Sequence, residues 1–151
     1  AKIAAISVVA AMMHAVLVIL ALAVGLVLGV PGEIPVYLLA AAFLSLAPMV
    51  AVAAWQSLLS MVIRSFATPI GIAVVASLIS FGALASGMAG VRFVSAPALL
   101  SETLWLGSTA VADAGAIDAG TVLTVVLTSA ALAAAGWAAS VAYLRWTDAR
   151  L

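Results

Sequence analysis

The fold of this chain is decided by the stretch from Glu33 to Arg64, EIPVYLLAAAFLSLAPMVAVAAWQSLLSMVIR. Its two charged residues stand at the ends, and the residues between them are uncharged and mostly apolar. A helix needs about 20 such residues to cross a hydrocarbon core about 30 Å thick. The stretch is long enough to cross once, so it predicts one membrane-spanning helix between two charged ends.

Three further intervals have the same character, and each encloses about 26 to 30 uncharged residues, which is long enough for a span. They run between Lys2 and Glu33, between Arg64 and Arg92, and between Asp118 and Arg145. Hydrophobic residues make up 68% of the chain and charged residues 7%, against roughly 45–50% and 25% in ordinary globular domains. We therefore predict an all-α membrane protein, a single transmembrane domain of residues 1–151 with spans over residues 3–30, 36–63, 68–90 and 121–144.

The segment 91–119, between the third and fourth spans, differs from the rest because charged residues divide it into short pieces. Ser95, followed by Ala and Pro, is a typical helix start, and a short apolar stretch continues from it to a Gly-Ser breaker at 107–108. Residues 109–114 have room for one or two further turns. We expect a pair of short helices on the external side, either re-entrant or lying in the membrane interface, before the last span.

The signs of the charges predict the orientation, since the side of a membrane protein that carries more Lys and Arg stays in the cytoplasm. With four spans, both ends and the turn after the second span lie on one side. That side carries four basic residues, Lys2, Arg64, Arg145 and Arg150. The other side carries Arg92 together with the acidic residues Glu33, Glu102, Asp113 and Asp118. Both termini are therefore predicted to be cytoplasmic.

The sequence contains no motif for catalysis or for cofactor binding. It has no cysteine, no GxxxxGK[ST] phosphate loop, no HExxH pair and no cluster of metal ligands. Its net charge is +0, so no basic surface favours nucleic acid. We predict that the chain is not an enzyme, binds no cofactor and draws any energy for transport from another subunit.

His14 is the only histidine and the only ionisable residue well inside a predicted span. Two interpretations stay open, because ionisable residues within a membrane often serve function. The first is a proton-responsive or substrate-contacting group, and the second is a neutral imidazole that is hydrogen-bonded to a neighbouring helix. The second is favoured, since a single histidine without carboxylate partners makes a poor proton relay.

Weakly polar side chains follow one face of the second span and one face of the fourth. Ser45, Gln56 and Ser60 share a face of the second span, and Thr124 and Thr128 share a face of the fourth. Such side chains either line a pathway or bind neighbouring helices together. In the second case each hydrogen bond between helices stabilises the protein by about 0.6 kcal/mol. Helix binding is the better interpretation for most of them. Gln56, the bulkiest polar side chain inside a span, is the first candidate for a pathway residue.

Three short stretches resemble ABC-2-type exporter permeases, and they are closest to those of lantibiotic immunity and bacitracin resistance. The stretch SLLSMVIRSFATPIGI, from Ser57 to Ile72, is similar to the cytoplasmic turn between the fourth and fifth helices of that family. The ending YLRWTD, from Tyr143 to Asp148, is similar to its last helix and tail. The opening at Ala1 looks like the start of its third helix. The resemblance covers this chain, but only about the last two-thirds of such a permease.

This resemblance implies a permease subunit in the bacterial cell membrane, paired with a second permease subunit and with a separate ATP-binding subunit. It implies export of a hydrophobic or amphipathic substrate, such as a peptide antibiotic or a lipid, and it places Arg64 and Ser65 in a cytoplasmic turn. The alternative is a structural or accessory subunit of a larger membrane complex, without a transport path of its own. A fragment of a secondary carrier is disfavoured, because the predicted spans hold no carboxylate.

Overall fold

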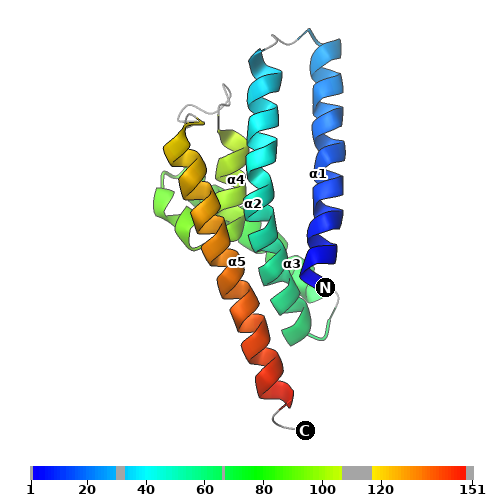
Figure 1. The fold of residues 1–151 in the computed structure, drawn as a ribbon, viewed down its shortest axis with the longest axis vertical. Coiled ribbons are helices and arrows are strands. Elements are labelled where there is room, and N and C mark those ends of the chain that lie inside the picture. Colours follow the sequence, from blue (N-terminus) through cyan, green and yellow to red (C-terminus); the bar gives the residue numbers. More distant parts are fainter. Residues whose placement is uncertain (1, 30–32, 66, 107–116, 149–151) are drawn as a thin grey trace.

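The computed structural model describes residues 2–29, 33–65, 67–106 and 117–148, and within them the chain forms helices and no strand (Figure 1). The described residues form four long helices, and two shorter helical elements lie between the third and the last of them. In chain order the elements are α1 (Lys2–Val27), α2 (Glu33–Val62), α3 (Ala67–Ala85), the short 3-10 helix η1 (Ala89–Phe93), α4 (Ala96–Trp105) and α5 (Ala119–Asp148). The all-α fold predicted from the sequence is confirmed.

Four of these helices are long and apolar enough to cross a membrane. Their spanning parts are Ala4–Val27, Val36–Val62, Ala67–Ala85 and Ala119–Thr147. Large apolar side chains face outward over much of their surface, as on α1, where Val27 is 86% exposed and Leu26 is 77% exposed. Outward apolar side chains are stable in lipid but not in water. The chain is thus a membrane protein with four candidate spans, as predicted.

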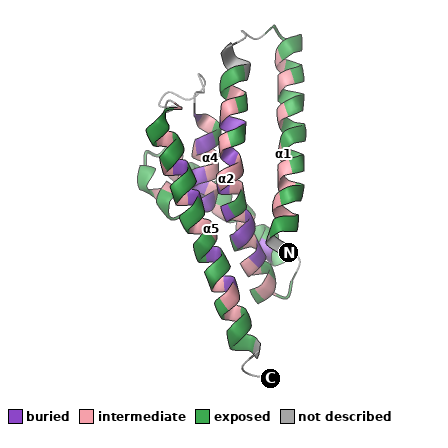
Figure 2. Ribbon diagram, viewed as in Figure 1, coloured by how far each residue is buried: buried purple, intermediate pink, exposed green. Residues whose placement is uncertain are grey.

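The helix α2 stands at the centre of the molecule, in contact with α1, α4 and α5 (Figure 1). Buried residues gather along α2 and α4 and on the facing side of α5, whereas α1 is covered on one side only (Figure 2). The core of α2 consists mainly of small residues, Ala41, Ala42, Ser45, Ala51, Ala53, Ala54 and Ser57. Small residues let helix backbones approach closely in a membrane, which explains why three helices fit around this one.

The helix ends lie on two sides of the molecule, in agreement with four alternating spans. The helix α1 begins, and α5 ends, on the side where α2 passes into α3 (Figure 1). On the opposite side α1 ends, α2 begins and α5 begins. The turn at Arg64 and Ser65 therefore lies on the same side as the first and last helix ends.

The chain turns back into the protein after α3. The third span was predicted to continue to about residue 90, but α3 ends at Ala85. Gly87, with a φ of 84°, ends the helix in a conformation that suits glycine, and Met88 N donates to Ala83 O at 3.0 Å to close the cap. The Oγ atoms of Ser80 and Ser95 then lie 2.7 Å apart. Ser80 lies five residues before the end of α3, which corresponds to about 7.5 Å along the helix axis. The chain at Ser95 has therefore come back by about that distance alongside α3.

The helix α4 begins deep in the protein and packs along α2. Its start is as predicted, because the Ser95 Oγ accepts a hydrogen bond from Ala98 N at 3.4 Å and a proline stands in its first turn. Ala98, Leu99 and Thr103 are fully buried, and α4 contacts α2, α3 and α5. The helix α4 is therefore buried against its neighbouring helices. The second short helix, predicted over residues 109–114, lies outside the described residues.

Candidate functional site

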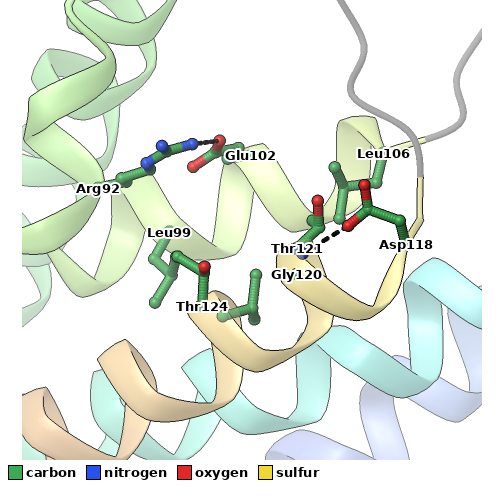
Figure 3. Close-up of a pocket in the computed structure, with 9 residues that line it drawn as sticks. Arg92, Leu99, Glu102, Leu106, Asp118, Gly120, Thr121 and Thr124 are labelled. Atoms are coloured by element: carbon green, nitrogen blue, oxygen red, sulfur yellow. Dashed lines mark hydrogen bonds and ion pairs between the residues drawn. The ribbon is translucent and has the colours of Figure 1, made fainter.

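A polar hollow lies between η1, α4 and the beginning of α5 (Figure 3). Its volume is about 290 Å³. Two charged side chains, Arg92 from η1 and Glu102 from α4, line one part, and Asp118, Thr121 and Thr124 line the part that belongs to α5. Its apolar lining comes from Leu99, Leu106 and Val125. The hollow thus combines three charged groups, two hydroxyls and an aliphatic wall.

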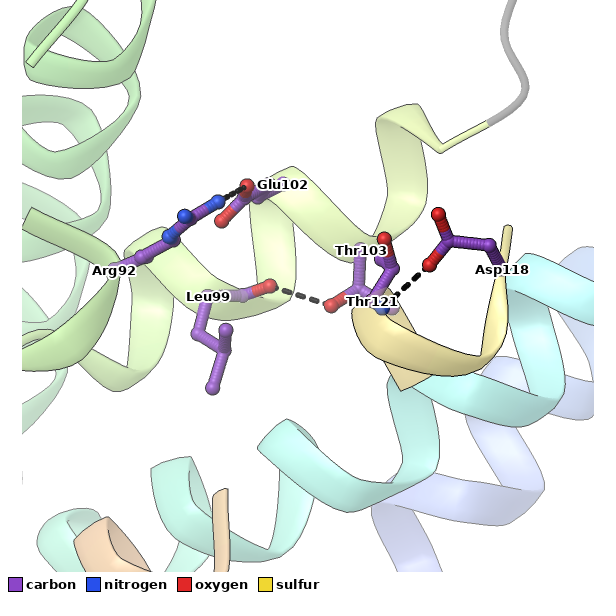
Figure 4. Close-up of polar contacts among 6 residues, drawn as sticks. All are labelled: Arg92, Leu99, Glu102, Thr103, Asp118 and Thr121. Carbon is purple, nitrogen blue, oxygen red and sulfur yellow. Dashed lines mark hydrogen bonds and ion pairs between the residues drawn. The ribbon is translucent and has the colours of Figure 1, made fainter. Parts of the chain in front are cut away.

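Arg92 and Glu102 form an ion pair inside this hollow (Figure 4). The pair has a single contact, in which Arg92 Nη1 donates to Glu102 Oε1 at 2.5 Å. Two further atoms of the pair, Arg92 Nε and Glu102 Oε2, are shielded from water and have no hydrogen-bond partner among the described residues. The guanidinium also lies 4.8 Å from the centre of the Phe93 ring. Each member of the pair therefore keeps unused hydrogen-bonding capacity.

Asp118 caps α5 at the edge of the same hollow. Its Oδ1 accepts a hydrogen bond from Thr121 N at 2.7 Å, which satisfies a backbone donor at the helix start. The hydrogen bonds from Thr121 hold the pKa of Asp118 below its ordinary value, so this carboxylate is charged at neutral pH. With Arg92 positive and Glu102 and Asp118 negative, the hollow carries one net negative charge.

Sequence reasoning counted Arg92 and Glu102 only as charges outside the membrane. A separation of ten residues between Arg92 and Glu102 corresponds to no helical or strand repeat, so it predicts no contact. The contact depends on the turn at Gly87 and on the return of the chain to Ser95. One signal was available in the sequence, since opposite charges in a short apolar segment are costly unless they pair.

Gln56, the first candidate for a pathway residue, lies where three hollows meet between α2 and α3. Their volumes are about 240, 460 and 360 Å³. The first reaches the start of α4 at Pro97, the second reaches Ser101 of α4, and the third reaches the turn at Arg64 and Ser65. Gln56 lines all three, and the three hollows together are here called the Gln56 groove.

Three of the serines that line the Gln56 groove are satisfied within their own helices. Ser60 Oγ donates to Gln56 O at 2.8 Å, Ser77 Oγ to Ala73 O at 2.8 Å and Ser101 Oγ to Pro97 O at 3.0 Å. The side-chain amide of Gln56 makes no hydrogen bond to another described residue. Among the described side chains that line the Gln56 groove within the spans, only the Gln56 amide has both a free donor and a free acceptor for an occupant.

His14 lies elsewhere, in a contact between α1 and α2. Its Nε2 is 3.0 Å from Ser45 Oγ and 3.3 Å from Ala42 O. Ser45 is buried and donates its own proton to Ala42 O at 2.7 Å. Nε2 therefore lies within hydrogen-bond distance of two oxygen atoms of α2. The geometry agrees with the interpretation of His14 as a residue that binds a neighbouring helix.

The candidates that shared a face in the sequence do not share a site. Ser45 faces α1, whereas Gln56 and Ser60 line the groove toward α3. Thr124 lines the polar hollow, and Thr128, one turn further along α5, does not. Ser65 Oγ accepts a hydrogen bond from Thr68 N at 3.4 Å, which places it at the start of α3.

Comparison with protein-family models, with curated proteins and with solved structures finds no match to this chain. The class of protein that the fold defines is an all-α membrane protein with four candidate spans.

Proposed function

We propose that this chain is a permease subunit of an ATP-driven ABC-2-type exporter, which moves a hydrophobic or amphipathic substrate outward across the bacterial cell membrane. The observation that carries the proposal is the Gln56 groove. It places one free amide among apolar walls, and it leads from the buried start of α4 to the turn at Arg64. Structural helices pack such amides against each other, so an amide that faces open space favours a pathway.

The groove suits a substrate with a polar part and an apolar part. Its wall from α3 consists of residues such as Ile70, Leu78 and Phe81, and α3 makes few contacts with α2. An amphipathic molecule would enter between these helices from the lipid, keep its apolar part in the bilayer and bind Gln56 with its polar part. A hydrogen bond formed away from water is stronger than one at the surface, so one amide can select the polar part.

The proposed assembly needs two partners. The first is a separate ATP-binding subunit, and the second is another permease subunit whose helices would close the groove. The excess of Lys and Arg at the ends and at Arg64 favours a cytoplasmic position for that side. The mouth of the groove at Arg64 and Ser65 would then open toward the ATP-binding subunit, and α4 would close the outer side.

The test combines purification with a substitution at Gln56. We expect an ATP-binding subunit to co-purify with the full-length permease from its native source in mild detergent. We expect Gln56→Leu to reduce transport or resistance about tenfold, because the loss of one hydrogen bond to the substrate corresponds to about a tenfold change in binding. The amount of co-purified ATP-binding subunit should not change. Ser86→Leu is the control, because Ser86 is exposed at the far end of α3 and lines none of the three hollows. Purification without any ATP-binding subunit would refute the proposal, and unchanged transport by Gln56→Leu would remove Gln56 from the path.

The alternative, a structural or accessory subunit without its own path, is supported by a different observation. His14 binds Ser45 across α1 and α2, and Trp55 Nε1 donates to Leu132 O at 3.1 Å across α2 and α5. These hydrogen bonds connect helices, and of the three residues only Trp55 also lines a hollow of the Gln56 groove. On this alternative, Gln56→Leu would change the amount of assembled complex, whereas the exporter proposal expects a normal amount of complex with reduced transport.

A further inference from the structure

The part of the Gln56 groove that lies at the turn between α2 and α3 carries a positive charge. This part, here called the Arg64 hollow, has a volume of about 360 Å³, and its lining includes Gln56, Ser60, Arg64, Ser65, Pro69 and Ile70. No acidic residue lines it. Arg64 is exposed and forms no ion pair within the described part of the chain. The Arg64 hollow therefore holds one positive charge that its own walls do not compensate.

An apolar hollow adjoins the Arg64 hollow on the side of the spans. The two share Gln56 of α2 and Ile70 of α3, and the apolar one has a volume of about 460 Å³. Its wall from α3 includes Leu78 and Phe81, and none of the residues that line it is charged. The walls thus change in order from a cation at Arg64, through the amide of Gln56, to apolar side chains of α3.

This order specifies the chemistry of an occupant. A guanidinium group binds a phosphate through parallel N–H bonds, and the partial positive charge at the start of α3 acts in the same direction. The Gln56 amide suits the ester and hydroxyl groups that follow a phosphate in a lipid. Because no carboxylate lines either hollow, nothing there would bind an ammonium group. An anionic head group therefore fits better than a zwitterionic one.

The positions of these groups match those of a lipid in the membrane. Arg64 follows the end of the spanning part of α2, Val36–Val62, so its charge lies where that helix leaves the membrane. Leu78 is 67% exposed and Phe81 is 51% exposed, so the apolar wall also faces the surrounding bilayer. The volume of the Arg64 hollow, about 360 Å³, equals about twelve water-sized groups at roughly 30 Å³ each, which is enough for a phosphate with its glycerol.

We propose that the Arg64 hollow and the adjoining apolar hollow bind an anionic phospholipid. The phosphate lies at Arg64, the ester groups lie at Gln56, and an acyl chain follows Leu78 and Phe81 of α3. The inference deepens the proposed exporter function and rests on it for the role of the lipid, because it makes an anionic amphiphile the substrate class. Binding itself needs no ATP-binding subunit.

The experiment measures which lipids the protein retains. The full-length permease is placed in nanodiscs that contain equal amounts of phosphatidylglycerol and phosphatidylcholine, and the lipids retained after transfer to detergent are counted by native mass spectrometry. Both lipids carry the phosphate, but only phosphatidylcholine adds a positive charge. We expect phosphatidylglycerol to be retained about tenfold over phosphatidylcholine, as for one charge-assisted hydrogen bond. Equal retention of the two lipids by the wild-type protein would overturn the proposal.

Two arginine substitutions separate a site from general attraction by a basic surface. Arg64→Gln should abolish most of the preference for phosphatidylglycerol. Arg145→Gln is the matched control, because Arg145 is an exposed arginine at the end of α5 on the same side and lines neither hollow. It should keep the wild-type preference. An equal loss in the two variants, or a folded Arg64→Gln protein with normal helix content and an unchanged preference, would overturn the proposal.

Two substitutions on α3 test the position of the acyl chain. Leu78→Trp fills the apolar hollow and should lower the retention of phosphatidylglycerol severalfold. Ile79→Trp is its control, because Ile79 is 66% exposed, almost as much as Leu78, but lines neither hollow. Retention that is the same in both tryptophan variants would contradict the placement of the chain along α3.

Failure of this inference can be told apart from failure of the exporter proposal. Retention that depends on Arg64, in a protein that purifies without any ATP-binding subunit, would refute the exporter role and support the lipid site. An ATP-binding subunit that co-purifies with a protein showing no preference between the two lipids would overturn the lipid site and leave the exporter proposal standing.

Discussion

At the scale of single residues, burial and hydrogen bonding separate polar side chains that look alike in the sequence. The buried Ser45 bonds with its own helix and with His14, so its position serves helix packing. Gln56 lies at an equivalent position on α2, but its neighbours leave space around its amide. The difference comes from the neighbouring helix, α1 in one case and α3 in the other, and α3 stands further from α2.

Asp118 gives a prediction about pH. Its pKa is lowered in the folded protein, mainly because its carboxylate accepts hydrogen bonds from Thr121. A lowered folded-state pKa means that the cap stabilises the protein fully above the ordinary aspartate pKa of about 3.9 and loses this effect as the pH falls through the lower, folded-state value. Asp118→Ala should therefore be less stable than the wild type at neutral pH and equal to it in strong acid. Thermal unfolding followed by circular dichroism over a pH series measures this difference.

Asp118→Asn is the control for that series. Asparagine caps a helix about as well as aspartate does, but it does not titrate. The asparagine protein should keep its cap at every pH and therefore lose less stability in acid than the wild type does. A stability difference between Asp118→Ala and the wild type that stays constant down to strong acid would contradict the assignment of the carboxylate as the cap.

At the scale of elements, the contact between α2 and α5 depends on a glycine. A Cβ atom on Gly136 would lie 3.2 Å from Ala54 Cβ and 3.3 Å from Trp55 N, so little space is available between the two helices. Gly136→Val should separate them, weaken the Trp55 hydrogen bond to Leu132 and lower the free energy of unfolding by about 1–3 kcal/mol. Denaturation in mild detergent, followed by circular dichroism, measures the change.

Gly82→Val is the matched control for Gly136→Val. A Cβ on Gly82 would meet no atom within 4 Å, so the same substitution on α3 should change the free energy of unfolding by less than about 0.5 kcal/mol. Equal destabilisation by the two substitutions would mean that valine itself disturbs these helices and that close packing at Gly136 is unimportant.

The start of α4 was predicted from the sequence, but the end of α3 and the depth of α4 were not. Ser95 with its following proline indicated the start of α4, because capping and the tolerance for proline are local properties of a helix start. The end of α3 was placed five residues too late, since the apolar stretch continues past Ala85 and the positive φ of Gly87 is not visible in hydropathy. The depth of α4 could not be predicted, because it depends on packing against α2.

At the scale of the whole molecule, the arrangement of helix ends gives a prediction of topology. The sequence has no cysteine, so single cysteines can be labelled without background. Ser65→Cys and Thr147→Cys lie at helix ends on the side where α2 passes into α3, and Ser86→Cys directly follows α3, which as a third span would lead to the other side of the membrane. In intact cells a membrane-impermeant maleimide should label Ser86→Cys alone, and in inverted vesicles it should label the other two. Labelling of Ser65→Cys and Ser86→Cys from the same side would contradict the four-span arrangement.

The two polar regions also differ at this scale. The Gln56 groove lies between spans and is bordered by the turn at Arg64, whereas the polar hollow lies at the other end, where α5 begins. A single chain thus presents one weakly polar region within the spans and one charged region at a membrane surface.

The sequence by itself determined that the chain is all-α, with four helices long and apolar enough to cross a membrane. These properties depend on the length of apolar stretches and on the positions of charged residues, both of which act locally through the free energy of transfer into lipid. Only the tertiary structure decided that Arg92 meets Glu102, that Ser45 and Gln56 face different helices, and that α4 returns into the protein. Those contacts join residues that are distant along the chain, and their geometry depends on how closely small residues let α2, α4 and α5 approach one another.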